Sequence, residues 1–177
     1  MLEDGRRQIV GFALPGDSCD AHAHMLGRID HSISALTSAT YAEVKRAAFE
    51  AIVAGERSIA EAFWCETLIN SAIQREWVVN LGRRSALERV AHLLCELFER
   101  LRIVGQVDHD SCDFPLTQMD AADAVGLSGV HVNRTLQELR AAGLIVLRGR
   151  TLTINDHRGL RDIALFSPGY LHRHPGR

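Results

Sequence analysis

The stretch SGVHVNRTLQELRAAGL, residues 128–144, carries polar side chains at a spacing that suits contact with nucleic-acid bases. At helical spacing, with Val132 pointing inward, Val130, Arg134 and Gln137 point nearly the opposite way, and His131, Asn133 and Glu138 flank them. Arginine can pair with guanine through two hydrogen bonds, asparagine or glutamine can pair with adenine, and valine can touch the thymine methyl. We therefore expect a helix whose outer face reads base edges in a major groove.

A polar outer face is common to exposed helices, so the flanking residues decide between a solvated surface and a binding face. Gly143 ends the helix, residues 144–147 predict a strand, Arg148-Gly149-Arg150 predicts a turn, and residues 151–154 predict a returning strand. Residues 128–161 hold six arginines against two acidic residues, although the whole chain has a net charge of −2. Positive charge is thus concentrated where a phosphate backbone would lie.

Two helices and a glycine turn must hold this face. Thr117 and Asp120 form a cap for a first helix, Gly126 supplies a left-handed exit, and Ser128 caps the second helix. Ser128 and the free N–H groups of the second helix's first turn suit a phosphate. Together with the hairpin, these elements predict a winged helix-turn-helix. The expected DNA-binding residues are Thr117, Ser128, Gly129, Val130, His131, Asn133, Arg134, Gln137, Arg148 and Arg150.

Upstream, residues 41–104 predict three helices. The first covers about residues 41–53, and the second, about 58–81, is apolar on more than one side. Such a helix needs more than one covering partner, which favours a homodimer through residues 58–81; the alternative is a central helix buried within one chain. Gly82 is expected to end it, and Ser85 with Glu88 forms a capping box for a third helix with one apolar stripe.

Residues 1–40 predict strands and turns, because Asp4-Gly5 and Pro15-Gly16-Asp17 flank the apolar run IVGFAL. So few strands must pack on something else. The aspartate-rich segment from Gly105 to Pro115 is expected to be a linker or loop, with a domain boundary near it. The predicted fold is α+β and mainly helical, with domains at 1–54, 55–105 and 106–177.

Composition excludes several classes of protein. The chain of 177 residues is 46% apolar, which is enough for a buried core. Cys19, Cys65, Cys95 and Cys112 form no CxxC pair, which is typical of reduced thiols in the cytoplasm. We expect no signal peptide, and no apolar run approaches the ~20 residues that would cross a membrane. No P-loop, dinucleotide-binding glycine pattern or nucleophile–base pair is present, so we expect no enzyme.

Residues 116–154, LTQMDAADAVGLSGVHVNRTLQELRAAGLIVLRGRTLTI, resemble the DNA-binding domain of the CRP/FNR family of bacterial transcription regulators. The resemblance continues upstream. DGRRQIVGFALPGD and SISALTSATYAEV are similar to late strands of that family's cyclic-nucleotide-binding-type β-roll, and residues 58–104 resemble its dimerisation helix and the helix that follows. It implies a partial β-roll, a long dimerisation helix and a homodimer on a palindromic operator, with half-sites about one helical turn apart. RNA polymerase is a further candidate partner.

The same resemblance singles out departures from the family. Arg134 matches an arginine that reads bases or phosphates, but Gly129 and Val130 stand where cyclic-AMP-responsive members have Arg and Glu. In GDSCDAHAHMLGRIDHS the family's Gly-Glu-Leu is absent, and His31-Ser32 stands where Arg-Ser would bind a phosphate. We expect a shortened sensor that does not respond to cyclic nucleotides, and neither a cofactor nor the iron–sulfur cysteine cluster of oxygen-sensing members.

Two further interpretations remain open from the residues. His22, His24 and His31, with Cys19 and Asp20, are a possible metal site, although a solvated loop fits them better. The alternative to a transcription regulator is a protein-interaction module that has lost sensing and specific DNA binding.

Overall fold

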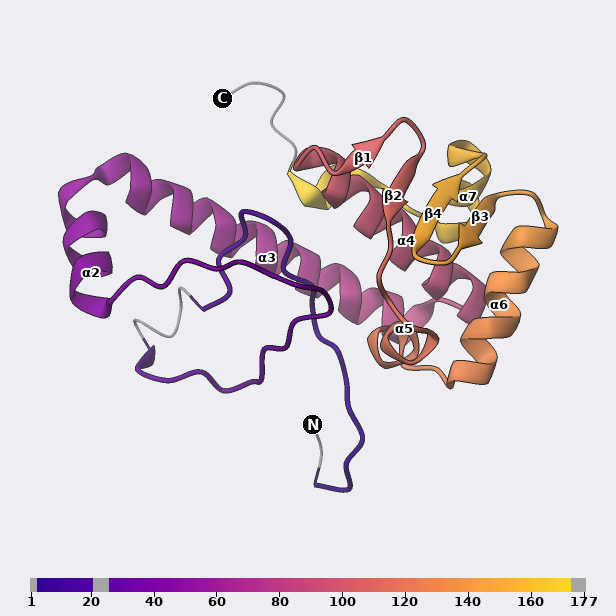
Figure 1. Ribbon diagram of the computed structural model, residues 1–177, viewed down its shortest axis with the longest axis horizontal. Helices are drawn as coiled ribbons and strands as arrows, with labels where there is room; N and C mark the ends of the chain where they lie inside the picture. Colours follow the sequence, from indigo (N-terminus) through magenta and orange to yellow (C-terminus); the bar gives the residue numbers. More distant parts are fainter. Residues whose placement is uncertain (1–2, 21–25, 173–177) are drawn as a thin grey trace.

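The computed structural model describes residues 3–20 and 26–172. Its elements are α2 (Arg46–Gly55), α3 (Arg57–Arg83), α4 (Ala86–Ile103), β1 (Val107–Asp108), β2 (Ser111–Asp113), α5 (Gln118–Val125), α6 (Gly129–Ala141), β3 (Ile145–Arg148), β4 (Thr151–Ile154), α7 (His157–Ala164) and the 3-10 helix η1 (Pro168–Leu171). Figure 1 shows α3 as a long rod, with α2 beside its first turns and the later helices and the sheet gathered around its other end.

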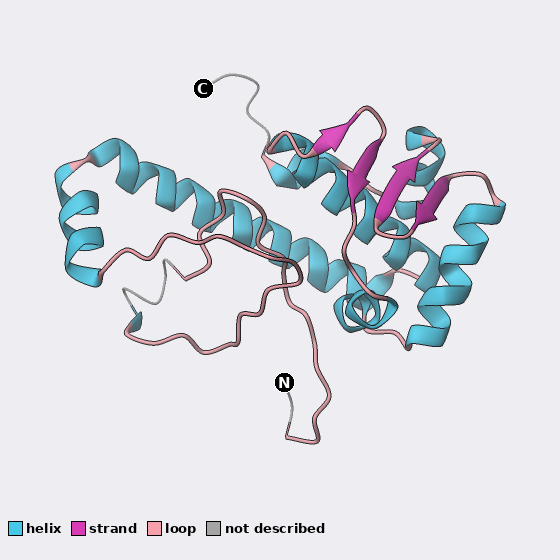
Figure 2. Ribbon diagram, in the orientation of Figure 1, coloured by secondary structure: helices cyan, strands magenta, loops and turns pink. Residues whose placement is uncertain are grey.

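The described residues of the N-terminal region lack the strands that were predicted there. Within residues 3–20 and 26–45 the structure has no strand, so the β prediction was wrong there (Figure 2). A strand needs a hydrogen-bonding neighbour, and a few strands alone are not stable in water. This part of the chain supplies no such neighbour, and IVGFAL instead runs in an extended conformation toward the helices.

The long helix predicted at about residues 58–81 is present, with different bounds. α3 covers Arg57–Arg83, and Gly82 lies inside it and does not end it. One glycine costs a helix only about 1 kcal/mol, which its neighbours easily offset. The break comes at Arg84, which is extended, because Ser85 begins α4 with the predicted capping box. Ser85 Oγ accepts from the Glu88 N–H, and the Glu88 carboxylate accepts from the Ser85 N–H at 2.7 Å.

α4 is the central helix of the C-terminal part of the chain. Every residue from Val90 to Glu99 is buried, and α4 packs against α5, α6 and α7. Its Leu94 and Phe98 belong to one apolar cluster that also contains Leu139 of α6 and Leu160 of α7. Since the buried middle of α4 shares one apolar core with α6 and α7, α4 packs as part of the winged helix-turn-helix that it supports.

The predicted linker at Gly105–Pro115 was wrong, because it contains β1 and β2. The antiparallel sheet has the order β1-β2-β4-β3, and Cys112 of β2 lies opposite Leu152 of β4. Both side chains are buried. The aspartates of this segment occupy exposed positions and the turn, so the local pattern resembles a loop. The pairing partner, β4, follows about forty residues later in the chain.

Candidate nucleic-acid interface

The helix-turn-helix is built as its sequence predicts. Thr117 caps α5 and Ser128 caps α6, each through its side chain, and Gly126 between the helices is left-handed with a φ of 65°. The inward faces are buried; they comprise Ala121, Ala122, Val125, Val132, Leu136 and Leu139. The buried face of α6 therefore anchors the helix, and its opposite face takes no part in that packing.

Two glycines let the helices approach closely. A Cβ at Gly126 would lie 3.3 Å from Cδ2 of Leu81, so the turn sits against the end of α3. A Cβ at Gly129 would lie 3.0 Å from Sδ of Met119, so the first residue of α6 sits against α5. The angle between the two helices thus depends on small residues at both ends of the turn.

The outer face of α6 is available to a ligand. Val130 is 83% exposed, Arg134 and Gln137 are also exposed, and His131 and Asn133 are half-buried beside them. Ser128, Val130, His131 and Arg134 line a shallow hollow of about 220 Å³. An exposed valine beside an arginine and two amides offers side-chain types that can contact base edges.

Arg134 is already held in place along the helix. Its Nη2 lies 2.9 Å from Nε2 of His131, and its Nε lies 3.7 Å from Oε1 of Glu138. These contacts come from the turn before and the turn after Arg134 on α6. The guanidinium therefore lies along the outer face of α6, between His131 and Glu138.

The predicted wing is present as strands β3 and β4. Arg148 of β3 pairs with Thr151 of β4, and Gly149 in the turn has a φ of 58°. Arg148 and Arg150 are exposed, and the Arg150 carbonyl accepts from the Phe114 N–H at the end of β2. The tip is therefore tied to the sheet while its two arginine side chains face solvent.

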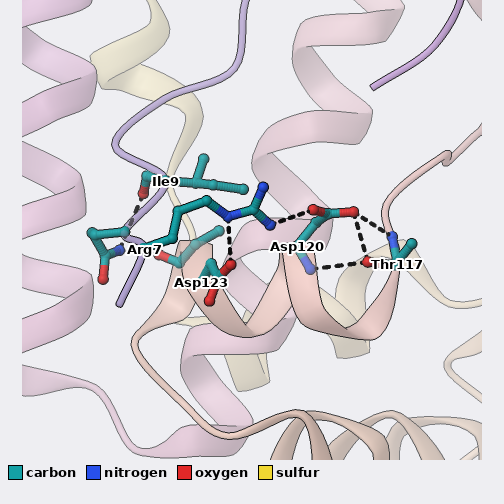
Figure 3. A network of polar contacts seen from close by, with 7 residues as sticks. Arg7, Ile9, Thr117, Asp120 and Asp123 are labelled. Carbon is teal, nitrogen blue, oxygen red and sulfur yellow. Dashed lines mark hydrogen bonds and ion pairs between the residues drawn. The ribbon is translucent and has the colours of Figure 1, made fainter. Parts of the chain in front are cut away.

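Some polar contacts in the structure connect residues that are far apart in the sequence and that the sequence analysis did not link. Arg7 donates from Nε to Asp123 at 2.7 Å and from Nη2 to Asp120 at 2.6 Å (Figure 3). Asp120 in turn accepts from both the N–H and the hydroxyl of Thr117. Burial raises the pKa of Asp120, but hydrogen bonds from Thr117 and Arg7 outweigh it and the net pKa is lowered. No local pattern around Arg7 signals a partner more than a hundred residues away.

Comparison with known proteins agrees with this geometry. Residues 88–163 match the Crp-like helix-turn-helix domain family. The nitrogen fixation regulation protein FixK of Rhizobium meliloti is 31% identical over 169 residues, which cover 92% of this chain and 71% of that protein. The chain belongs to the CRP/FNR family. The matched segment begins inside α4, consistent with the place of that helix in the core.

Other CRP/FNR relatives extend the comparison. FixK of Bradyrhizobium diazoefficiens is 34% identical over 83% of this chain and 61% of its own length. The activator FnrL of Cereibacter sphaeroides is 30% identical, over 84% of this chain and 60% of its own length. The chain thus spans about three fifths of the length of these relatives. The solved structure of FixK2 from Bradyrhizobium japonicum superposes with a TM-score of 0.61 at 26% identity, over 68% of this chain and 59% of that one.

The histidines named as a candidate metal site lie only partly within the described residues. Across residues 3–20 and 26–172 there is no group of three potential metal ligands, and His22 and His24 of the suggested metal site lie outside the described residues. Nδ1 of His31 lies 2.9 Å from the Asp30 carboxylate. An adjacent carboxylate makes this a poor place for a phosphate.

The cysteines are free thiols in two environments. Cys19 and Cys65 are exposed, whereas Cys95 and Cys112 are buried. Burial raises the pKa of Cys95 to about 12 and that of Cys112 to about 11, so these two thiols stay protonated and act as small apolar core residues. Within the part of the chain that is described, no helix has the length and apolarity needed to cross a membrane.

Proposed function

We propose that this chain is a DNA-binding transcription regulator of the CRP/FNR type, which reads its operator with the outer face of α6. The observation that carries the proposal is the exposed set of Val130, Arg134 and Gln137 on a helix whose other side is buried. The match to the Crp-like helix-turn-helix domain and the names of its relatives, regulators and activators of transcription, support it.

The proposed contacts divide by chemistry. Thr117, Ser128 and Gly129 lie at helix starts, where backbone N–H groups suit phosphates. Base edges are read by Val130, His131, Asn133, Arg134 and Gln137. Arg148 and Arg150 of the wing contact the backbone next to the groove. Phosphate contacts set position and affinity, and base contacts set sequence preference.

A homodimer through residues 58–81 follows from the unpaired side of α3. Trp64, Leu68 and Val78 are 63%, 61% and 71% exposed and recur at helical spacing on one side. Ile73 and Trp77 point the other way and are buried against the chain's own core. A second copy would cover the exposed stripe, and a twofold dimer would present two α6 helices to a palindromic operator.

Cyclic nucleotides are not part of the proposed mechanism. The stretch that would hold the phosphate lacks the family's Arg-Ser pair, and His31 lies beside Asp30. The proposed regulator works in the cytoplasm, where the chromosome is. RNA polymerase is its expected partner during activation, as the activators among its relatives suggest.

Selection of bound genomic fragments tests the proposal. The purified full chain is mixed with sheared source DNA at near-physiological salt without an effector, and bound fragments are sequenced. Enrichment of an inverted repeat is the expected result, and the variant Arg134→Ala should lose it. A folded sample of the unaltered chain that enriches no sequence would overturn the proposal.

A protein-interaction module is the second candidate. The exposed stripe of α3 favours it, since Trp64 and Leu68 could equally pack against a different protein. This candidate predicts no site preference in the selection and a chain that stays monomeric on its own.

A further inference from the structure

Residues 7–18 form a segment, here called the N-terminal strap, that joins the helix-turn-helix to the long helices. Its first three residues all bind α5: Arg7 through two ion pairs, Gln8 through its amide, and Ile9 through its backbone. Figure 3 shows Arg7 reaching over α5 toward Asp120 and Asp123. α5 is the helix that carries the Thr117 cap and lies against Gly129 at the start of α6.

The strap satisfies groups that a helix end leaves open. The last carbonyls of an α-helix have no partner inside the helix. At the end of α5, the Asp123 carbonyl accepts from the Ile9 N–H at 3.0 Å, and the Ala124 carbonyl accepts from Nε2 of Gln8 at 3.2 Å. The strap thus satisfies two carbonyls at the end of α5, while Nη1 of Arg89 donates to the last one, Val125.

The rest of the strap is anchored on α3 and α4. The Val10 carbonyl accepts from Gln74 at 2.6 Å, and the Phe12 carbonyl accepts from Arg100 at 2.7 Å. The Phe12 ring packs edge-on against Trp77 with centroids 5.9 Å apart. One short segment therefore bonds to the proposed dimer helix, to the core helix and to the helix-turn-helix.

Charge adds to the effect of these bonds. Asp120 and Asp123 are two carboxylates on the helix whose start is the proposed phosphate contact. Arg7 is the cation that pairs with both, and its guanidinium geometry suits carboxylates. Without it, α5 would lose two tethers to the strap.

We propose that Arg7 is a positioning residue for DNA recognition: by binding Asp120 and Asp123 it fixes α5, and with it the start of α6, relative to α3. Displacement of the strap would release this hold and lower DNA affinity without any change in the residues that touch DNA. The inference rests on the proposed DNA-binding function and adds the N-terminal region as the segment that controls it.

The test compares Arg7→Ala with Arg6→Ala in the full chain. Arg6 is the matched control, because it is an exposed arginine one residue away whose hydrogen bonds and ion pair go to Asp4 and not to α5. Arg7→Ala should weaken binding to the selected operator about five- to tenfold, and Arg6→Ala should leave it within twofold. Arg7→Lys, which keeps the charge but not the two-pronged geometry, should recover part of the loss.

Salt dependence separates positioning from direct contact. A phosphate-contacting arginine lowers the slope of log affinity against log salt by about 1 when it is removed. Arg7→Ala should leave that slope unchanged, since Arg7 acts through the two aspartates. In a double-mutant cycle with Asp123→Asn, the second substitution should cost little once Arg7 is gone. Additive losses, or a changed slope, would overturn the inference.

A second readout keeps this inference distinct from the proposed function. Amide hydrogen exchange of α5 should rise in Arg7→Ala and stay unchanged in Arg6→Ala, with or without DNA. If the unaltered chain binds no operator, the proposed function fails and exchange alone decides the role of Arg7. If the chain binds DNA and both variants behave alike in affinity and in exchange, the positioning role is wrong.

Discussion

Nη2 of Arg134 lies 2.9 Å from Nε2 of His131, one turn earlier on α6. Together with Glu138 on the following turn, His131 holds the guanidinium before any DNA is present. A side chain that is already ordered loses less conformational entropy when it binds. The pair also makes His131 a support for Arg134 in addition to its proposed base contact.

Arg134→Ala is expected to reduce sequence discrimination as well as affinity. Loss of an arginine that pairs with a base costs about 1–3 kcal/mol on the specific site and much less on random DNA. Binding isotherms on the selected operator and on scrambled DNA at one salt concentration measure both values. Arg140→Ala, an exposed arginine in the last turn of the same helix, is the control. Equal losses on the two DNAs would contradict base reading by Arg134.

The wing is expected to contribute affinity that does not depend on sequence. Arg148→Ala should weaken binding to operator and scrambled DNA by similar factors and lower the salt slope by about 1. A salt titration of each variant measures the slope. The exposed Arg158 of α7 is a suitable control, because it pairs within its own helix at 4.0 Å from Asp162. An unchanged slope in Arg148→Ala would remove the wing from the phosphate contacts.

Leu68→Glu is expected to separate a dimer without unfolding the chain. Leu68 is 61% exposed in the monomer, so the substitution should change monomer stability by only about 0.5 kcal/mol, whereas a charge inside a dimer seam is strongly unfavourable. Sedimentation should show a shift to monomer, together with loss of tight binding to the inverted repeat. Asn70→Glu, exposed on another side of α3, is the control. A dimer that persists in Leu68→Glu would place the interface elsewhere.

His92 is expected to make the fold sensitive to mild acid. It is 1% exposed between α3 and η1, where it faces Glu76 and Arg84 and stacks on Tyr170. Burial, with a smaller effect of Arg84, lowers its pKa from 6.5 to about 3. Between these values the unfolded chain binds the proton and the folded chain does not, so stability falls as pH falls.

Denaturant unfolding of His92→Gln checks this pH dependence. Relative to the unaltered chain, the variant should show a flatter change in the free energy of unfolding between about pH 7 and about pH 5, because one proton-binding difference has been removed. Nε2 of His92 also lies 3.3 Å from the Glu76 carboxylate, although it makes no hydrogen bond there. If the charged imidazole of His92 paired with Glu76, the unaltered chain would instead gain stability relative to the variant as the pH falls. That result would reject the buried neutral form.

The sequence by itself determined the elements that depend on near neighbours in the chain. The caps at Thr117, Ser85 and Ser128, the left-handed Gly126, the apolar spacing of α6 and the arginine-tipped turn each arise from contacts a few residues apart. Their energies are set by backbone geometry and helical periodicity, so they can be predicted without the rest of the fold. The exposed face of α6 followed from the same periodicity, while its role in binding stays a prediction.

Tertiary structure decided everything that depends on a distant partner. Cys112 lies in a strand because Leu152 pairs opposite it, residues 3–20 form no strand, and Gly82 remains helical because the capping box at Ser85 sets the break. The contacts of Arg7 with Asp120 and Asp123 likewise join residues more than a hundred positions apart in the sequence. Such pairings are chosen by the burial and hydrogen bonding of the whole chain, which local patterns do not contain.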